Sequence, residues 1–377
     1  MRRRRVSKED QEKMVARSLL REKSTDELLE AKDWIESLLA YRASSKLHKT
    51  YITGIERAIE YNEANKVFCS YNLDGTATGR LSCGSYNAEK PMGVSFHTLP
   101  RDTNNNIRNI FVANKGEAFV TIDYAGMELR VLAHVANDEV MQKAFLDGAD
   151  LHSYSASLLF NKPQDSISKD ERQIAKATSF LIVYGGTAFT LSNNNRIPID
   201  QAERIIDTYM EVFPGIGKYI DDTYSTIQQQ GEITSIFGRK RRLPNVFSDD
   251  TKLQKRSMRQ GLNFTIQSAA SDIILCAIKG LGDRLPATGA RIVSTVHDSL
   301  EIVCPQPTMK ECLEICYDEM VNTPTLREAF DIHPNVPLKI DSEVGKSFGD
   351  SQEVHYSGDG KVQNEQQLLQ YLKGQGL

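Results

Sequence analysis

The sequence predicts an α+β fold with an antiparallel sheet and long helical segments. Three runs are rich in the β-branched and aromatic residues that strands favour: residues 118–122, 291–296 and 299–303. Only His297 and Asp298 separate the last two runs, which is hairpin spacing although these are not the preferred turn residues. Residues 7–66 and most of residues 145–262 have helical patterns instead.

The first 70 residues are expected to form a helical arm. Residues 7–66 are rich in Glu, Lys, Ala and Leu and contain one glycine, Gly54, and no proline, which predicts two or three amphipathic helices. Residues 71–100 are richer in Gly, Ser, Thr and Asn, which predicts loops and short strands at the start of a second unit.

The strand-like run 118–122 ends at Asp123 and Tyr124 and leads into a helical pattern over residues 127–135. Residues 145–262 are expected to form a separate helical lobe with breaks at residues 162–163, 213–215 and 242–244. Beyond residue 350, a segment of biased composition precedes a short amphipathic stretch, which predicts a linker and a small helix.

The composition excludes several classes of protein. The 377 residues include 46 basic and 50 acidic ones, a net charge of −4, and this ordinary balance excludes disorder, collagen and coiled coil for the whole chain. No apolar run approaches the roughly 18 residues of a membrane span. The basic start Met1–Arg5 leads into no apolar segment, so it is not a signal peptide. We therefore expect a cytoplasmic protein that contacts no membrane.

The six cysteines form no Cys-x-x-Cys pair, which favours buried reduced thiols over disulfides or zinc ligands. The charge of the chain is distributed unevenly. Between Arg239 and Gln260, eight basic residues accompany two acidic ones, a local balance of +6. Binding of DNA depends on such local clusters more than on net charge.

One helix gives the strongest local signal. Arg172, Lys176, Phe180 and Tyr184 recur every four residues and lie on one helix face. A capping box at residues 168–171 would start this helix, and a Gly-Gly pair would end it. The two cations lie near the positive end of the helix dipole and could hold a polyphosphate, while the two rings could support a sugar and a base. The spacing alone also fits an ordinary amphipathic helix.

Two aspartates are expected on rigid elements, Asp123 at a strand end and Asp298 in the hairpin turn. Such a carboxylate pair can hold two divalent ions about 4 Å apart, although each aspartate alone is more often a turn residue.

In order and spacing, these segments resemble the polymerase motifs of family A, the DNA polymerase I type. The main matches are Asp123-Tyr-Ala-Gly-Met-Glu-Leu-Arg130, Arg172-x3-Lys176-x3-Phe180-x3-Tyr184-Gly185 and Val296-His-Asp298. Lesser matches include residues 76–82 and 150–152, and the resemblance extends from about residue 41 to residue 350.

The resemblance implies a right-hand polymerase fold. Its palm would be an antiparallel sheet formed by residues 71–145 and 263–350. Its fingers would be a helical lobe over residues 146–262, and its shortened helical thumb would be the arm at residues 1–70. Residues 351–377 would form a tail with a short amphipathic helix.

The resemblance also assigns roles to matching residues. Two Mg²⁺ ions, for which Mn²⁺ can substitute, would be held by Asp123, Asp298 and the backbone carbonyl of Tyr124. The incoming dNTP would be bound by Arg172, Lys176, Phe180, Tyr184 and His152, with Lys176 also acting as general acid to the pyrophosphate. Glu128 would be the steric gate against a ribose 2′-hydroxyl. Primer-template DNA would be contacted by Arg80, Arg259, Asn263, Gln267 and His297.

The sequence departs from the family pattern in three ways. Gly126 stands where the family usually has Gln, and Ser299 stands where a Glu usually follows the metal-binding Asp, so support around the metals would be weaker or differently supplied. Nothing before residue 41 has the length of a full thumb or an acidic nuclease constellation. We therefore expect a monomeric polymerase core of the phage or viral kind, with the nuclease or remaining thumb on a separate chain. If a phage encodes it, its location would be the host cytoplasm.

Two other functions fit part of the pattern. A single-chain phage-type RNA polymerase shares the Arg-x3-Lys helix and the His-Asp-Ser turn, but Glu128 and Phe180 favour deoxynucleotides. A non-catalytic nucleic-acid-binding remnant fits the missing thumb, but the intact pair Asp123 and Asp298 argues against it. The sequence therefore predicts a template-directed DNA polymerase of replication or repair that releases pyrophosphate.

Overall fold

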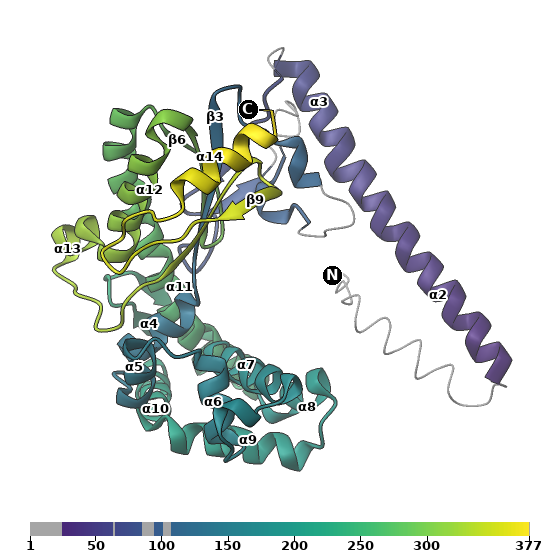
Figure 1. The fold of residues 1–377 in the computed structure, drawn as a ribbon. Helices are drawn as coiled ribbons and strands as arrows, with labels where there is room; N and C mark the ends of the chain where they lie inside the picture. Colours follow the sequence, from purple (N-terminus) through teal and green to yellow (C-terminus); the bar gives the residue numbers. More distant parts are fainter. Residues whose placement is uncertain (1–24, 63–64, 85–93, 101–106, 377) are drawn as a thin grey trace. The chain divides into compact units, whose positions relative to one another are not determined.

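The computed structural model describes residues 25–62, 65–84, 94–100 and 107–376. Predictions for residues 1–24 lie outside the described residues. The chain divides into two compact units, residues 1–70 with 84–95 and residues 71–83 with 96–377, and each unit is described by itself (Figure 1).

The smaller unit contains the helical arm. Helix α2 (Thr25–Lys46) continues through a π-helical turn (Leu47–Ile52) into α3 (Thr53–Asn62). The prediction of helix is confirmed over the described residues. The prediction that α2 is amphipathic is wrong. None of its described side chains is buried, and Trp34 and Tyr41 are about two thirds exposed. A helix buries an apolar stripe only where another element packs on it, and sequence alone did not show where packing begins.

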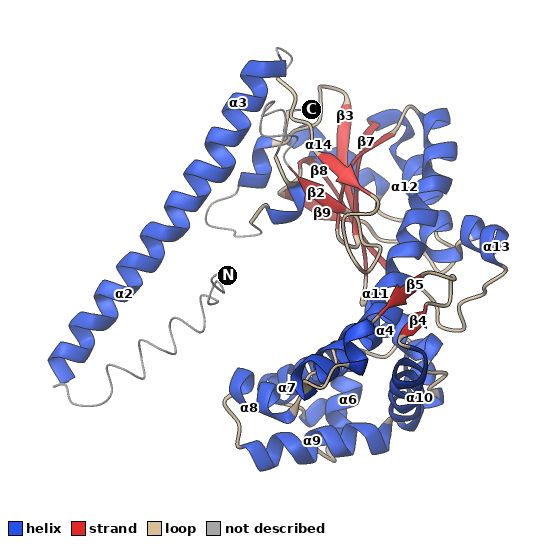
Figure 2. Cartoon of the chain, turned by 180° about the vertical axis from the view of Figure 1, so that it is seen from behind, coloured by secondary structure: helices blue, strands red, loops and turns tan. Residues whose placement is uncertain are grey.

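A five-stranded antiparallel sheet is the centre of the larger unit (Figure 2). Its strand order is β6-β7-β3-β8-β9. The strand bounds are β3 Glu117–Tyr124, β6 Arg291–Val296, β7 Ser299–Pro305, β8 Ile340–Ser347 and β9 Asp350–Glu353. The α+β class and the hairpin are confirmed. The predicted linker from residue 351 is wrong at its start, because β9 pairs with β8 at the sheet edge.

The two faces of this sheet have opposite characters. One face is buried in the main core and includes Val120, Ile122, Leu300, Ile302 and Val344. The other face is apolar at Phe119 and Val303 but polar towards the end of β3, where register places Thr121 opposite Glu301 and Asp123 opposite Ser299. The β6–β7 turn therefore lies beside the last residues of β3.

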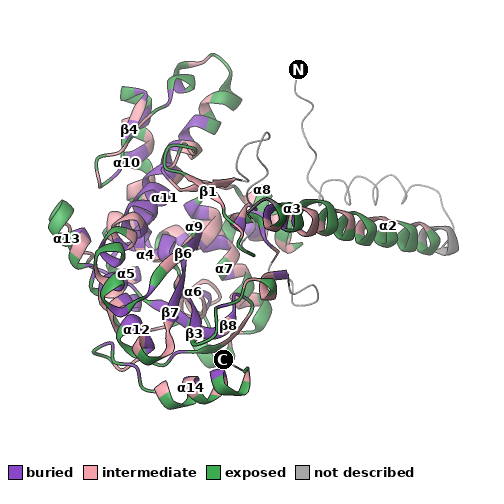
Figure 3. Ribbon diagram, turned by 90° about the horizontal axis from the view of Figure 1, so that it is seen from above, coloured by how far each residue is buried: buried purple, intermediate pink, exposed green. Residues whose placement is uncertain are grey.

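Helix α11 (Thr251–Arg284) is the longest helix described. With its following turn, Thr251–Thr288 is long and apolar enough to cross a membrane by length and composition, so the expectation that no run approaches such a length is wrong for this helix. However, 78% of its most apolar window is buried inside the protein (Figure 3), which is typical of a core helix. The helix is continuous through residues 262 and 263, so the predicted border between fingers and second palm segment falls inside one element.

The expected helical lobe is largely present. Its helices are α6 Leu151–Leu159, α7 Lys169–Val183, α8 Ala188–Asn195, α9 Ile199–Val212 and α10 Pro214–Gln230. The three predicted breaks coincide with helix ends or fall outside these helices. A short hairpin of β4 (Glu232–Thr234) and β5 (Lys240–Arg242) was not predicted, because three-residue strands leave almost no periodic signal.

Two short strands and five further helices complete the described α-helices and strands. They are β1 Ser70–Asn72, β2 Ser82–Gly84, α4 Met127–Val135, α5 Glu139–Leu146, α12 Met309–Tyr317, α13 Pro324–Phe330 and α14 Glu365–Gly374. The predicted tail helix is α14, whose Leu368 and Leu372 are buried. All six cysteines are reduced thiols, as predicted, but the predicted burial is confirmed only for Cys304, Cys312 and Cys316.

Candidate active site

Asp123 and Asp298 come together because the β6–β7 hairpin pairs with β3. The backbone N–H of Tyr124 donates to the carbonyl of Asp298 at 3.2 Å. His297 has a left-handed backbone, with φ +60°, which allows a two-residue turn. Burial raises the pKa of Asp298, Arg80 opposes that rise, and the nearby Asp123 carboxylate adds to it.

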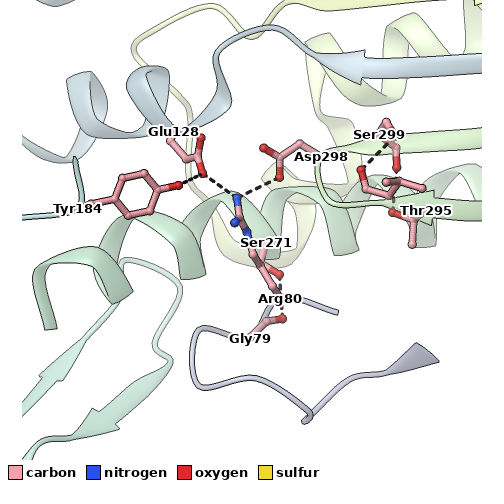
Figure 4. Close-up of polar contacts among 9 residues, drawn as sticks. Gly79, Arg80, Glu128, Tyr184, Ser271, Thr295, Asp298 and Ser299 are labelled. Carbon is pink, nitrogen blue, oxygen red and sulfur yellow. Dashed lines mark hydrogen bonds and ion pairs between the residues drawn. The ribbon is translucent and has the colours of Figure 1, made fainter. Parts of the chain in front are cut away.

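Arg80 bridges two acidic side chains (Figure 4). Its Nη2 donates to Glu128 Oε1 at 2.7 Å and to Asp298 Oδ1 at 3.4 Å. The Tyr184 hydroxyl donates to the same Glu128 oxygen at 3.4 Å. These contacts join a loop, helix α4, the end of α7 and the hairpin turn. The loop that contains Arg80 is held by α11, where the Ser271 hydroxyl donates to the carbonyl of Gly79 at 2.8 Å.

Glu128, the predicted sugar gate, is the second residue of α4 and is only 9% exposed. Burial raises the pKa of this carboxyl, and the charge of Asp298 raises it further, while Arg80 and Tyr184 lower it. The Arg80 guanidinium and the Tyr184 hydroxyl both bond to this carboxyl, so the Glu128 side chain has a fixed position beside the aspartate pair.

Helix α7, the finger helix of the expected polymerase fold, begins and ends as predicted. Ser168 and Glu171 form a capping box, and Gly185 follows the helix with φ +61°. Arg172 makes a two-pronged contact with Asp150, Nε to Oδ2 at 2.8 Å and Nη2 to Oδ1 at 3.1 Å. Lys176, one turn further on, is exposed.

His152 lies on α6 next to this helix. Its ring is 6.1 Å from that of Phe180, which packs against the main core. The pKa of His152 is lowered by burial, with Lys176 and Arg172 adding to the effect and Asp150 opposing it. A neutral imidazole therefore accompanies the two cations at neutral pH.

The predicted DNA contacts are distributed over α11 and the hairpin turn. Arg259 packs against the end of the finger helix, since a Cβ on Gly185 would lie 2.9 Å from its Cγ. Asn263 has a buried side-chain nitrogen without a hydrogen-bond partner, and Gln267 is buried. The exposed His297 ring lies 4.9 Å from that of His97.

Part of the basic segment is neutralised by acidic side chains of the same chain. Arg239 pairs with Asp272 at 2.8 Å and Lys240 with Glu232 at 2.8 Å. Other members, such as Lys255 on α11, are exposed. The local surplus of positive charge therefore overstates the charge available to a ligand.

Sequence reasoning missed Glu301. This carboxylate lies on β7, has an exposed fraction of 0% and accepts hydrogen bonds from Thr121 and Ser299. Burial raises its pKa from 4.5 to about 7, opposed by these two hydroxyls. An acidic residue inside an otherwise apolar strand was the available signal. Asp341, which lies opposite Asp123 on β8, was also missed.

The aspartate pair fits a divalent cation. Its ligands are hard carboxylate oxygens, and the raised pKa of Asp298 shows that this partly buried site favours compensation by positive charge. The described residues contain no group of three or more His, Cys, Asp or Glu side chains suited to a metal. A cation here would therefore need backbone, water or substrate oxygens as well.

A carboxylate pair and a helix with cations and aromatic rings are groups that could hold a phosphorylated ligand and its cations. The chain belongs to DNA polymerase family A, whose family model matches residues 4–350. It is similar to "DNA polymerase I, thermostable" of Thermus thermophilus, at 30% identity over 326 residues. It is also similar to DNA polymerase I of Bacillus caldotenax, at 32% identity over 322 residues.

These alignments cover 85% and 84% of this chain but only 37% and 35% of the two relatives, so the chain spans about a third of their length. Among solved structures, it resembles the POL domain of Pol1 from M. smegmatis in complex with DNA primer-template and dNTP. That match has a TM-score of 0.74 and 27% identity, and covers 86% of this chain and 56% of the other.

Proposed function

We propose that this protein is a template-directed DNA polymerase that adds dNTPs to a primer 3′-hydroxyl and releases pyrophosphate. The observation that supports this most directly is the junction of β3 with the hairpin turn, which brings Asp123 beside Asp298 in a chain of DNA polymerase family A. The solved structural relative contains primer-template DNA and dNTP, the substrates proposed here.

The carboxylates of Asp123 and Asp298, with the carbonyl of Tyr124, would hold two Mg²⁺ ions. Bound there, magnesium would acidify the primer hydroxyl and offset charge on the triphosphate. In this structure, Arg80 pairs with Asp298 at 3.4 Å. When cations bind, the guanidinium would either contact the carboxylate together with them or move away from it. It would then be free to contact DNA.

The finger helix would bind the triphosphate. Arg172 and Lys176 offer guanidinium and ammonium donors on one face, close to the uncharged His152. Because Arg172 is half exposed and paired with Asp150, its guanidinium is pre-oriented by that carboxylate yet still open to phosphate. Lys176, on the same face, would protonate the leaving pyrophosphate.

The nucleoside would be selected at the other end of this helix. Phe180 would support the sugar, and Tyr184 would border the template base. Glu128 is held by Arg80 and Tyr184, and this fixed wall would clash with a ribose 2′-hydroxyl. That feature favours a DNA polymerase over the RNA-polymerase alternative.

In a right-hand description, the antiparallel sheet would be the palm, the α6–α10 lobe the fingers and the α2–α3 arm a shortened thumb. Arg259, Asn263, Gln267 and His297 would contact primer or template. A cytoplasmic location, a monomeric state and a separate nuclease or thumb chain remain predictions.

Primer extension with Mg²⁺ tests the proposed function. The unmutated protein should extend a primer with dNTPs, and Asp123→Ala or Asp298→Ala should abolish extension. A matched control is Asp283→Asn, because this exposed carboxylate pairs with Lys279 on the surface of α11. Equal activity of the native protein and both alanine variants would refute the assignment.

A further inference from the structure

A buried carboxylate lies next to the residues that flank Asp123 and Asp298, and it has no part in the proposed nucleotide addition. Glu301 is fully buried on the polar face of the sheet. Both of its oxygens accept hydrogen bonds: Thr121 Oγ1 donates to Oε2 at 2.7 Å, and Ser299 Oγ donates to Oε1 at 2.8 Å. Burying a carboxylate is costly, so its position needs an explanation.

The two donors flank the proposed metal ligands. Thr121 precedes Asp123 by two residues on β3, and Ser299 directly follows Asp298. Strand register places Thr121 opposite Glu301 and Asp123 opposite Ser299, so these four side chains share one face of two neighbouring strands. One carboxylate therefore joins the strand ends that hold both aspartates.

Ser299 is also held within the β6–β7 hairpin. The Thr295 hydroxyl donates to the carbonyl of Ser299 at 2.9 Å, and Val296 pairs with Ser299 across the hairpin. Movement of the Ser299 side chain would consequently move the turn that contains Asp298.

We propose that Glu301 is a positioning residue of the metal site, which clamps β3 to β7 through Thr121 and Ser299 and so fixes the spacing of Asp123 and Asp298. The inference rests on the proposed function, because it takes these aspartates as the metal ligands. Ser299 is then the link to a carboxylate two residues further along β7. Glu301 would therefore orient the metal ligands in place of the Glu that the family usually has at position 299.

Manganese binding tests this clamp without requiring turnover. Electron paramagnetic resonance of Mn²⁺ titrated into the protein should show affinity about ten- to a hundredfold weaker for Glu301→Gln, the usual effect of removing a partner of metal ligands. The matched control is Glu343→Gln. Glu343 lies opposite Thr121 on the other neighbouring strand, but is exposed and bonded to Ser351, so this control should bind Mn²⁺ like the native protein.

Steady-state kinetics distinguish positioning from a general loss of folding. In Glu301→Gln, kcat should fall by about the same factor as the affinity, while KM for dNTP should stay near the native value because Arg172 and Lys176 are on α7. Thr121→Val removes one hydroxyl without changing side-chain size and should weaken Mn²⁺ binding in the same direction.

Native Mn²⁺ affinity in Glu301→Gln would overturn the inference. If that variant does not fold, native affinity in a folded Thr121→Val would do so. Failure of the unmutated protein to extend a primer would instead count against the proposed function, and the Mn²⁺ comparison would still decide whether Glu301 orders the pair.

Discussion

The buried carboxyl of Glu301 makes stability depend on pH in a direction that can be measured. Its pKa is raised from an ordinary value of 4.5 to about 7, chiefly by burial. Between these values, the folded chain binds more protons than the unfolded chain, so the free energy of unfolding falls as pH rises. The contribution is complete below pH 4.5 and is lost as pH passes through about 7.

The size of this effect follows from the two pKa values. One pH unit corresponds to about 1.4 kcal/mol, so the interval from 4.5 to about 7 corresponds to about 3 kcal/mol. Glu301→Gln has no proton to lose at this position. Its unfolding free energy relative to the native protein should therefore rise by up to about 3 kcal/mol between about pH 5 and about pH 8. The Ser299 hydroxyl can turn to the Val296 carbonyl, an alternative acceptor at 3.1 Å.

Urea unfolding followed by circular dichroism, in buffers containing EDTA, measures this difference. Other titrating groups cancel because only the native-minus-variant difference is used, and the chelator removes cations that would lower the carboxyl pKa. A difference that stays constant within about 0.5 kcal/mol would refute a raised pKa at Glu301. Taken with the Mn²⁺ experiment, we expect Glu301→Gln to be more stable at alkaline pH but to bind Mn²⁺ more weakly. Such a trade-off between stability and activity is typical of functional sites.

Three further predictions concern separate parts of the site. Glu128→Ala should raise rNTP incorporation relative to dNTP by about ten- to a hundredfold in single-nucleotide extension, because the wall against the 2′-hydroxyl is lost; an unchanged ratio would disprove the gate. Gly126→Ala should lower the free energy of unfolding by about 1–2 kcal/mol, since φ there is +64° although a Cβ would meet nothing within 4 Å. Its control, Gly282→Ala at an equally open helical position, should raise stability by about 0.5–1 kcal/mol, and equal effects would contradict the backbone argument. Ser168→Ala should cost about 1 kcal/mol in chemical unfolding because it removes the cap of α7, and no loss would show that the capping box is not stabilising.

Local features of the site could be read from the sequence because they depend on neighbours a few residues apart. The capping box at Ser168, the start of α7 and the two-residue turn before β7 follow from short-range hydrogen bonds and spacing. The face shared by Arg172 and Tyr184 follows from helix periodicity. The prediction failed where burial decided the outcome, as in α2, none of whose described side chains is buried.

Thus the sequence alone determined the α+β class, the helix with its cations and aromatics, and the two aspartates at strand ends. Only the tertiary structure joined Arg80 to Glu128 and to Asp298, partners 48 and 218 residues away. It alone buried Glu301 against Thr121 and Ser299, which flank the two aspartates in the sequence. Such contacts depend on strand register and on what covers each face of the sheet, and neither leaves a periodic signal in a single chain.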